Sequence, residues 1–209
     1  MNAVIPDTLK AELAAGATKV AKIGLMPLTQ GNLSLRDPNS GLILVTPHDY
    51  DYDVMTQDDI VVVDIDGNII AGKHEPSAET QVHLAVYERR PEVFGIVHAE
   101  PVYTNVFGVL HKPIAPVHVG MAIDVGGECP VMPFEHSGSR EFGYHMLEYM
   151  GNKNAVIWAN HGMLSVGPTL RKAIHCAVLL EMTAKIYHAA LQIGTPVSLS
   201  DDIIEFLIG

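Results

Sequence analysis

Imidazole and carboxylate side chains, the types that bind divalent metals, stand at the ends of two short apolar runs in this sequence. His98 and Glu100 are two residues apart in the run Ile-Val-His-Ala-Glu-Pro. Side chains alternate along a strand, so these two would share one face and could bind one cation. A metal site that does chemistry usually takes three protein ligands and leaves one position open. His161 is the candidate third ligand, because it lies where the apolar run 155–158 meets Gly162, a glycine that allows a tight turn.

A second carboxylate, Glu79, stands near the start of a predicted helix over 77–88 that Ser77 can cap, in the segment Pro-Ser-Ala-Glu-Thr. A carboxylate beside a metal can move a proton to or from a substrate, so Glu79 is the candidate acid/base. Simpler interpretations stay open from the residues alone. His98 and Glu100 could belong to an ordinary strand with a hydrogen-bonded imidazole. Glu79 could be no more than a favourable carboxylate in the first turn of its helix.

The elements that must position these residues follow from the hydrophobic pattern. Spacing and capping residues predict helices over 6–23, 77–88, 102–110, 139–150 and 169–193. Alternating or apolar runs predict strands over 31–36, 41–46, 60–65, 69–70, 94–99, 114–119, 155–158 and 163–166. Turn residues join the first two strands and the next two into hairpins, and 132–139 is expected to be irregular. This pattern favours an α/β fold with an antiparallel-rich sheet covered by helices over a doubly wound parallel sheet.

Length and composition narrow the possibilities further. The 209 residues, 48% of them hydrophobic, are enough for one core, and no linker divides them, so we expect a single domain over 1–209. With 24 acidic against 13 basic residues, the net charge of −11 argues against nucleic-acid binding. No apolar run reaches eighteen residues, and the stretch from Met1 to Lys10 lacks signal-peptide features. We therefore expect no membrane association and a cytoplasmic location, with Cys129 and Cys176 as two buried thiols.

Six short motifs, in matching order and approximate spacing, make the chain resemble the class II aldolase/adducin-head family, and within it the L-fuculose-phosphate aldolases. The motifs are Gly31-Asn32-x-Ser34-x-Arg36, Thr46-Pro47, Pro76-Ser77-x-Glu79, His98, Gly138-x-Arg140-Glu141 and Asn160-His161-Gly162. The resemblance covers nearly the whole chain. It implies a three-layer α/β/α fold, one divalent ion (zinc or manganese) per subunit, and a homotetramer with sites between subunits.

The resemblance also implies a function and a role for each matching residue. It implies a metal-dependent lyase that cleaves a carbon–carbon bond of a ketose, its phosphate or a related hydroxy-keto acid through a metal-stabilised enediolate. Glu79 resembles the family's proton-carrying glutamate and favours the aldolase branch over the epimerase branch. His98 and His161 resemble metal ligands, with Glu100 as a ligand where the family has a second histidine. The positions implied to bind the sugar or sugar-phosphate substrate are Gly31, Asn32, Thr46 and Ser77.

The sequence also departs from the family pattern. Glu100 adds negative charge beside the metal, which weakens it as a Lewis acid. At the phosphate pocket, Ala78 lacks a hydroxyl donor and Asp49 would repel a phosphate, which leaves an unphosphorylated substrate open. Val119 stands where the family has an aromatic residue that acts as an acid. The sequence ends at Gly209, before the family's C-terminal tyrosine. The candidate substitutes in proton transfer are Tyr103, His118 and His136.

Alternatives therefore remain at this stage. The chain could be a decarboxylase or epimerase of the same family, or a non-catalytic assembly domain like the adducin head. Asn32 and Ser34 could be plain hairpin residues. We expect His111, His145, His175 and His188 to be surface or core groups. The acidic residues Asp51, Asp53, Asp58 and Asp59 lack the pattern of a calcium loop and are expected to be solvated.

Overall fold

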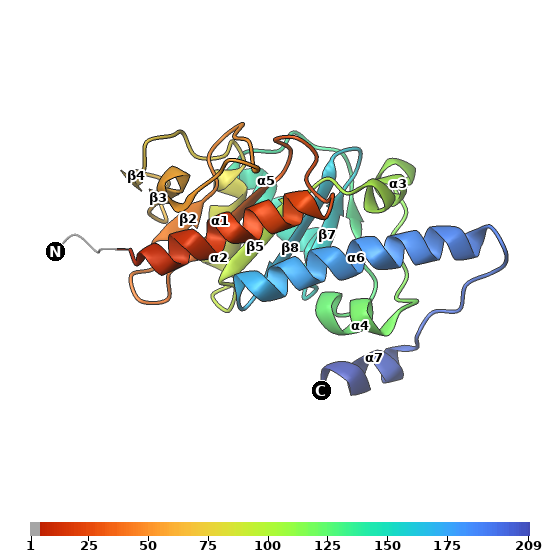
Figure 1. Cartoon of the computed structure of the whole chain (residues 1–209). Coiled ribbons are helices and arrows are strands. Elements are labelled where there is room, and N and C mark those ends of the chain that lie inside the picture. The colour runs from red at the N-terminus through yellow and green to blue at the C-terminus, as the bar shows by residue number, and fades with distance from the viewer. Residues whose placement is uncertain (1–4) are drawn as a thin grey trace.

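One eight-stranded sheet runs through residues 5–209, the part of the chain that the computed structural model describes (Figure 1). The strand order is β4-β3-β2-β1-β5-β8-β7-β6, and the neighbouring pairs are antiparallel except for β6 and β7. The strands are β1 Asn32–Arg36, β2 Ile43–Val45, β3 Val61–Val63, β4 Ile69–Ala71, β5 Gly95–Ala99, β6 Val131–Met132, β7 Ala155–Trp158 and β8 Gly162–Gly167.

Helices cover both faces of this sheet. In Figure 1, α1 and α6 cross in front of the strands, while α2 and α5 lie behind them. The helices are α1 Asp7–Lys22, the 3₁₀ helix η1 Gln57–Asp59, α2 Thr80–Arg89, α3 Val102–Leu110, α4 Val119–Val125, α5 Arg140–Met150, α6 Leu170–Leu191 and α7 Asp201–Ile208. The expected three-layer α/β/α fold with a mostly antiparallel sheet is confirmed.

Strand β5 shows how the sheet separates two hydrophobic cores. Val97 and Ala99 belong to the core under α1 and α6, whereas Ile96 belongs to the core under α2 and α5. Because side chains alternate along a strand, His98 faces the side of α2 and α5, as Ile96 does. Alternation along the strand therefore accounts for His98, whereas Glu100 lies one residue beyond the end of β5 at Ala99.

The two predicted hairpins are present, and short side chains close their turns. In the β1–β2 hairpin, where Ser34 pairs with Val45, the Asp37 carboxylate accepts hydrogen bonds from the backbone N–H groups of Asn39 and Ser40. In the β3–β4 hairpin, the Asp64 carboxylate accepts from the backbone of the turn in the same way. Such local bonds between side chain and backbone are why Asp favours turns.

Several sequence predictions were wrong in detail. The segment 114–119 is not a strand, because it makes one bridge at Ile114 and then starts α4 at Val119. His118 caps that helix by accepting from the Gly120 N–H at 3.1 Å. Ser77 does not cap α2, whose N-cap is Glu79. The hydrophobic pattern also missed the short elements η1, β6 and α7, because a periodic signal needs a longer run.

The acidic loop was only partly predicted correctly. Asp59 is buried rather than solvated, and it pairs with Lys73 and His74, each at 3.0 Å. Burial by itself would raise the pKa of Asp59, but His74, Thr56 and Lys73 outweigh that effect and lower it. Asp51, Asp53 and Asp58 are exposed as expected.

Other expectations concern the thiols, the N-terminus and the membrane. Cys129 and Cys176 are buried free thiols, as predicted. Residues 1–4, the start of the stretch without signal-peptide features, lie outside the described residues. Among the residues that the structure describes, no helix combines the length and the apolar character needed to cross a bilayer.

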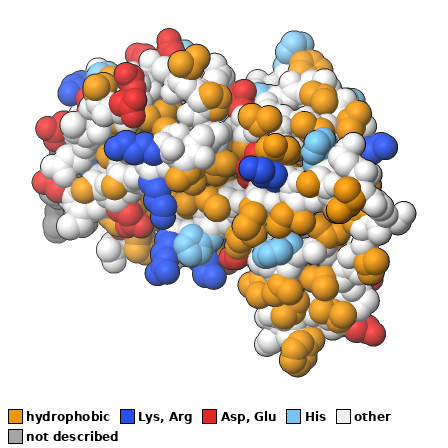
Figure 2. Space-filling model, turned by 45° about the vertical axis from the view of Figure 1, so that its right-hand side comes forward, with side chains coloured by type: hydrophobic (Ala, Val, Ile, Leu, Met, Phe, Trp, Pro, Cys, Tyr) orange, Lys and Arg blue, Asp and Glu red, His pale blue; other side chains and the backbone are white. Residues whose placement is uncertain are grey.

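A large share of the exposed apolar side chains lies on α3, α4, α6 and α7. Figure 2 shows hydrophobic side chains gathered over this side of the molecule. Phe206 is the most exposed of those on the helices, at 85%. The large ones are Val102, Val109, Leu110, Val119, Ile123, Met182, Ile186, Leu191, Ile203, Phe206 and Ile208. Exposed apolar side chains gathered on one side of a protein often mark a contact surface.

Candidate metal centre

A cavity of about 370 Å³ opens where the ends of β1 and β5 meet the loops that precede α2 and α5. The sequence-predicted site residues that line it are Gly31, Asn32, Ser77, Glu79, His98, Glu100 and His161. Thr46 does not line it. Thr46 is fully buried behind the wall, where its hydroxyl accepts from the Leu33 N–H and its carbonyl from the Ser77 N–H.

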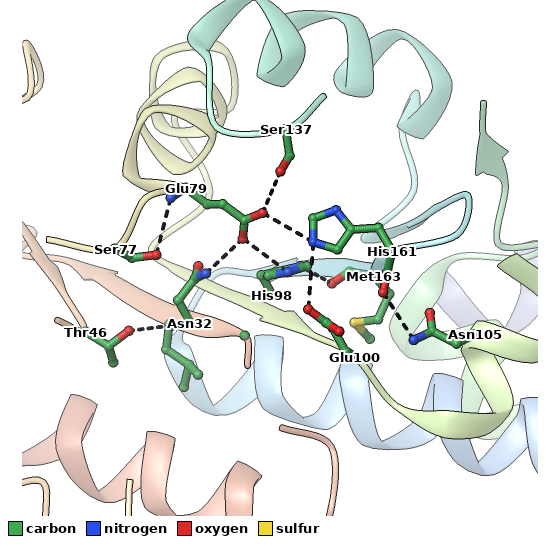
Figure 3. Close-up of polar contacts among 12 residues, drawn as sticks. Asn32, Thr46, Ser77, Glu79, His98, Glu100, Asn105, Ser137, His161 and Met163 are labelled. Carbon is green, nitrogen blue, oxygen red and sulfur yellow. Dashed lines mark hydrogen bonds and ion pairs between the residues drawn. The ribbon is translucent and has the colours of Figure 1, made fainter. Parts of the chain in front are cut away.

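Glu79, His98 and His161 converge in this cavity (Figure 3). One ligand atom from each lies within 4.8 Å of the ligand atoms of the other two. Oε2 of Glu79 is 3.1 Å from Nε2 of His98, and Oε1 is 3.6 Å from Nε2 of His161. Glu100 is not part of this cluster. Its Oε1 lies 3.8 Å from Nε2 of His161, a member of the cluster. The sequence prediction gave Glu79 only a proton-transfer role, whereas the structure also brings it within reach of a shared ion.

His98 is held in one orientation by its surroundings on β5. Its ring stacks on Trp158 with 4.4 Å between centroids, and its Nδ1 lies 3.0 Å from the backbone oxygen of Met163 on β8. A carbonyl can only accept, so Nδ1 carries a hydrogen, and in the neutral ring Nε2 presents its lone pair to the cavity. This second contact is the usual support of a metal-binding histidine.

The contact between His98 and Glu79 tests whether a metal fits. With the Nδ1 hydrogen committed to Met163, neutral His98 presents a lone pair to a carboxylate oxygen 3.1 Å away. Two acceptors cannot form a hydrogen bond with each other, so a proton or a metal cation must lie between them. Two imidazole nitrogens and one carboxylate are also a donor set that suits zinc or manganese. The residues present therefore fit a divalent ion.

Two glycines allow the backbone to bring these groups together. A Cβ on Gly162 would lie 2.6 Å from the Ala99 carbonyl oxygen and 3.0 Å from Cγ of Glu100. Gly31 has φ +80°, and a Cβ there would lie 2.7 Å from the His98 carbonyl oxygen. The sequence predicted a tight turn before β8 from Gly162. The closeness of Gly162 to the backbone of Ala99 explains why no larger residue fits there.

The Glu79 carboxylate is oriented by two donors. Asn32 Nδ2 donates to Oε2 and the Ser137 hydroxyl donates to Oε1, both at 2.9 Å. Burial by itself would raise the pKa of Glu79, but His98, the Asn32 bond, His161 and the Ser137 bond outweigh it and hold the pKa below its usual value. Glu79 is therefore an ionised carboxylate at neutral pH.

Burial has opposite effects on the pKa values of Glu100 and His161. Burial raises the pKa of Glu100, with His161 opposing this and Glu79 adding to it. Burial and His98 lower the pKa of His161, although both carboxylates oppose them. A neutral His161 is the form that can bind a metal.

The structure also sorts the remaining candidates. Ser137 is a site residue that the sequence reasoning missed, since it lies in the segment 132–139 expected to be irregular; the adjacent motif starting at Gly138 was the available signal. Ser34 is internal, bonded to Tyr87 and His83. Among the described residues that line the cavity, the suggested proton-transfer substitutes Tyr103, His118 and His136 are absent.

The chain is similar to known proteins in both sequence and structure. The sequence profile described as "Class II Aldolase and Adducin N-terminal domain" matches residues 11–188. The L-fuculose phosphate aldolase of Escherichia coli O6:H1 strain CFT073 is 33% identical over 195 residues, which cover 91% of this chain and 87% of that protein. The 5-deoxy-D-ribulose 1-phosphate aldolase of Bacillus thuringiensis serovar kurstaki is 29% identical, covering 94% and 92%. A solved structure of L-fuculose 1-phosphate aldolase matches with a TM-score of 0.92 and 32% identity, covering 97% and 95%.

Proposed function

The chain belongs to the class II aldolase and adducin N-terminal domain family and is an enzyme of its aldolase type, and on this premise we propose that it is a divalent-metal-dependent lyase. Its reaction would be the cleavage of a carbon–carbon bond in a small hydroxy-ketone sugar or sugar phosphate. The observation that carries the proposal is the convergence of Glu79, His98 and His161 in one cavity. A cavity of about 370 Å³ suits a substrate of this size.

His98 and His161 would hold the ion through Nε2, together with a carboxylate. Glu79 is the nearer carboxylate to both imidazoles, and Glu100 adds a second one beside His161. Zinc and manganese both accept such mixed nitrogen and oxygen ligands. The bound ion supplies Lewis-acid stabilisation of the negative charge that develops on the substrate oxygens.

Glu79 is the proton carrier in this proposal. Its ionised carboxylate takes the proton from the hydroxyl on the carbon whose bond breaks, and that carbon leaves as an aldehyde. The other fragment keeps the electron pair of the broken bond and receives a proton on its carbon in return, so the atoms balance. Asn32 and Ser137 hold the carboxylate in place for both transfers.

A homo-oligomer, a tetramer by family resemblance, is the assembly that we propose. The exposed apolar side chains of α3, α4, α6 and α7 support a subunit contact on that side (Figure 2). Light scattering coupled to gel filtration measures the mass directly. A monomer at micromolar concentration would contradict this part of the proposal.

The metal content of purified protein tests the site. Wild-type protein, stripped with a mild chelator and reloaded with zinc or manganese, should hold near one ion per chain. The double variant His98→Ala, His161→Ala should hold none. The matched control, His145→Ala with His175→Ala, removes two imidazoles outside the cavity and should load like wild type.

The reaction is tested separately by coupling aldehyde release to a dehydrogenase, with a panel of ketoses and ketose 1-phosphates. Metal-loaded wild type should release an aldehyde from at least one member, and the double variant should not. A metal-loaded wild type that cleaves no member of the panel would contradict the proposed function.

A further inference from the structure

One face of α3 lies against the strand that leads into the turn of His161. Asn105, Gly108 and His111 recur every three residues along this helix and its C-cap, so they share that face. In the middle of the face, a Cβ on Gly108 would lie 3.1 Å from Cγ2 of Ile157 on β7. The absence of a side chain at Gly108 therefore lets α3 pack closely on the end of β7, directly before the turn.

The two polar residues of this face contact the turn itself. Asn105 Nδ2 donates to the His161 carbonyl oxygen at 3.2 Å (Figure 3). Farther along α3, Nε2 of His111 lies 2.9 Å from Oδ1 of Asn160. Asn160 has φ +58°, a left-handed conformation that costs free energy in residues other than glycine, so contacts from outside help to hold the turn. A fixed carbonyl at His161 also limits where the imidazole of the same residue can lie.

The amide of Asn105 is oriented by this one bond. Its Oδ1 is buried and has no hydrogen-bond partner among the described residues. The amide cannot turn over, because Oδ1 would then meet the His161 carbonyl oxygen and two acceptors repel each other. A buried acceptor without a donor costs free energy, so an apolar side chain of this size would serve stability alone about as well. The donor, and not the packing, therefore explains an amide at position 105.

Glu181 of α6 fixes the first turn of α3. Its carboxylate accepts from the Tyr103 N–H at 2.9 Å, from the Thr104 N–H at 2.7 Å and from the Thr104 hydroxyl at 2.8 Å. The first N–H groups of a helix have no partner within it, and a carboxylate placed there is stabilising. Asn105 is the next residue along the chain. Its donor is thus tied to α6, the longest helix in the described part of the chain.

We propose that Asn105 is a positioning residue of the metal centre, which holds the turn of His161 against α3 and so keeps the imidazole within reach of Glu79 and His98. Glu181 is the anchor through which α6 fixes Asn105. Neither Asn105 nor Glu181 lines the cavity, so both act through His161 and not on the substrate. The proposal rests on the proposed function, because that function places a metal ion between these side chains.

The substitution Asn105→Leu tests this, because it removes the donor and keeps the approximate volume. The midpoint of thermal unfolding of metal-free protein should stay within about 4 °C of the wild-type value, since the unpaired Oδ1 is removed as well. The dissociation constant for zinc, measured by competition with a chromophoric chelator, should rise about 10- to 100-fold. The visible spectrum of cobalt-loaded protein, which reports how the ligands are arranged around the ion, should also change.

The matched control is Val106→Ala. Val106 is half-buried on the same turn of α3, and its side chain cannot form any of these hydrogen bonds. This variant should lower the unfolding midpoint and leave the zinc dissociation constant and the cobalt spectrum unchanged. An unchanged zinc dissociation constant in Asn105→Leu, or an equal rise in Val106→Ala, would overturn the proposal.

Glu181→Gln tests the anchor, because it leaves one acceptor and turns an N–H₂ group toward the donors of the first turn of α3. It should raise the zinc dissociation constant by less than Asn105→Leu does. Added to Asn105→Leu, it should cause no further rise, because two residues that act through one contact are not additive. No rise in the single variant, or a full further rise in the double variant, would overturn the role given to Glu181.

Hydrogen exchange of metal-free protein separates this proposal from the proposed lyase. Asn105→Leu should speed exchange of the backbone amides of 159–162, whereas Val106→Ala should not. A wild type that binds no metal refutes the lyase, and exchange at 159–162 then decides whether Asn105 positions His161. Unchanged exchange there overturns the positioning role. A protein that shows all of these changes but cleaves no ketose keeps the positioning role and refutes the lyase.

Discussion

Glu79 and Glu100 approach the same nitrogen, because their carboxylate oxygens lie 3.6 and 3.8 Å from Nε2 of His161. Only Glu79 of the two also contacts His98, and the pKa directions of the two carboxyls are opposite, lowered for Glu79 and raised for Glu100. An ion between the imidazoles would therefore meet one carboxylate that is already ionised and oriented. Glu100 is half-buried and less firmly held than Glu79. Replacing Glu100 and replacing Glu79 should therefore have different effects on the centre.

Glu100→Gln should weaken metal binding without abolishing it. The substitution removes a negative charge beside the centre but leaves the cluster of Glu79, His98 and His161. We expect the metal dissociation constant to rise about 10- to 100-fold, the range seen for groups that support a metal site. Competition with a chromophoric chelator measures it, and an affinity equal to that of wild type would exclude Glu100 from the centre.

Glu79→Gln should remove turnover while keeping the fold. Glutamine can accept from Asn32 and donate to the Ser137 hydroxyl, but it cannot carry the proton. We expect kcat to fall about 10²- to 10⁴-fold, the usual contribution of a positioned acid/base. Stopped assays of aldehyde release measure kcat, and thermal unfolding checks the fold. Wild-type turnover in this variant would refute the role of Glu79.

His83 should make stability depend on pH. It is fully buried, its Nδ1 is 2.7 Å from the Ser34 hydroxyl, and burial lowers the pKa of His83 to about 3. An unfolded histidine has a pKa of about 6.5, so between these values the unfolded chain binds the additional proton. The free energy of unfolding should then fall as pH falls below about 6.5, by up to ~1.4 kcal/mol per pH unit.

The matched variant is His83→Asn, whose amide oxygen can accept from Ser34 without titrating. Urea unfolding of metal-free protein at pH 4.5, 5.5 and 6.5 should give a smaller dependence on pH for this variant than for wild type. His145→Asn, an exposed position, should follow wild type. Parallel pH dependences for wild type and His83→Asn would contradict the prediction.

Gly162→Ala should destabilise both the fold and the centre. The new Cβ would lie 2.6 Å from the Ala99 carbonyl oxygen, which is backbone and cannot rotate away. We expect a loss of about 1–3 kcal/mol or more, as for overpacked positions, together with weaker metal binding. Gly194→Ala is the control, because a Cβ there meets nothing within 4 Å. Equal stability of the two variants in urea would show that β5 and β8 can separate at no cost.

The sequence predicted the long elements because their hydrophobic patterns are periodic over several turns. The helix over 169–193 and the hairpin over 31–46 are the clearest cases, and both are present as α6 and as β1–β2. The helix α4 was not predicted, and a strand was expected over 114–119 just before it, since seven residues containing Gly120 carry no helical period and the N-cap is a histidine. Asp59 was expected to be solvated with the rest of its loop, and its burial depends on Lys73 and His74, which are distant in sequence.

The candidate site was predicted unevenly for the same reason. His98 follows from alternation along its strand and His161 from a turn glycine, so local patterns were enough for these two, whereas Glu100 lies beyond the end of β5 and outside the cluster. Their convergence with Glu79 depends on how α2 packs behind β5, which no local pattern contains. Ser137 becomes visible as a site residue only when the packed side chains are in place.

The position of His98 in the middle of the sheet has a kinetic consequence. β5 is paired with β1 on one side and β8 on the other, so its amides should exchange with deuterium only when the whole fold opens. Ser137 lies in an irregular segment next to the exposed residues 133–136, where local opening should be frequent. The two sides of the candidate centre should thus differ in hydrogen exchange, which should be fast around Ser137 and slow at His98.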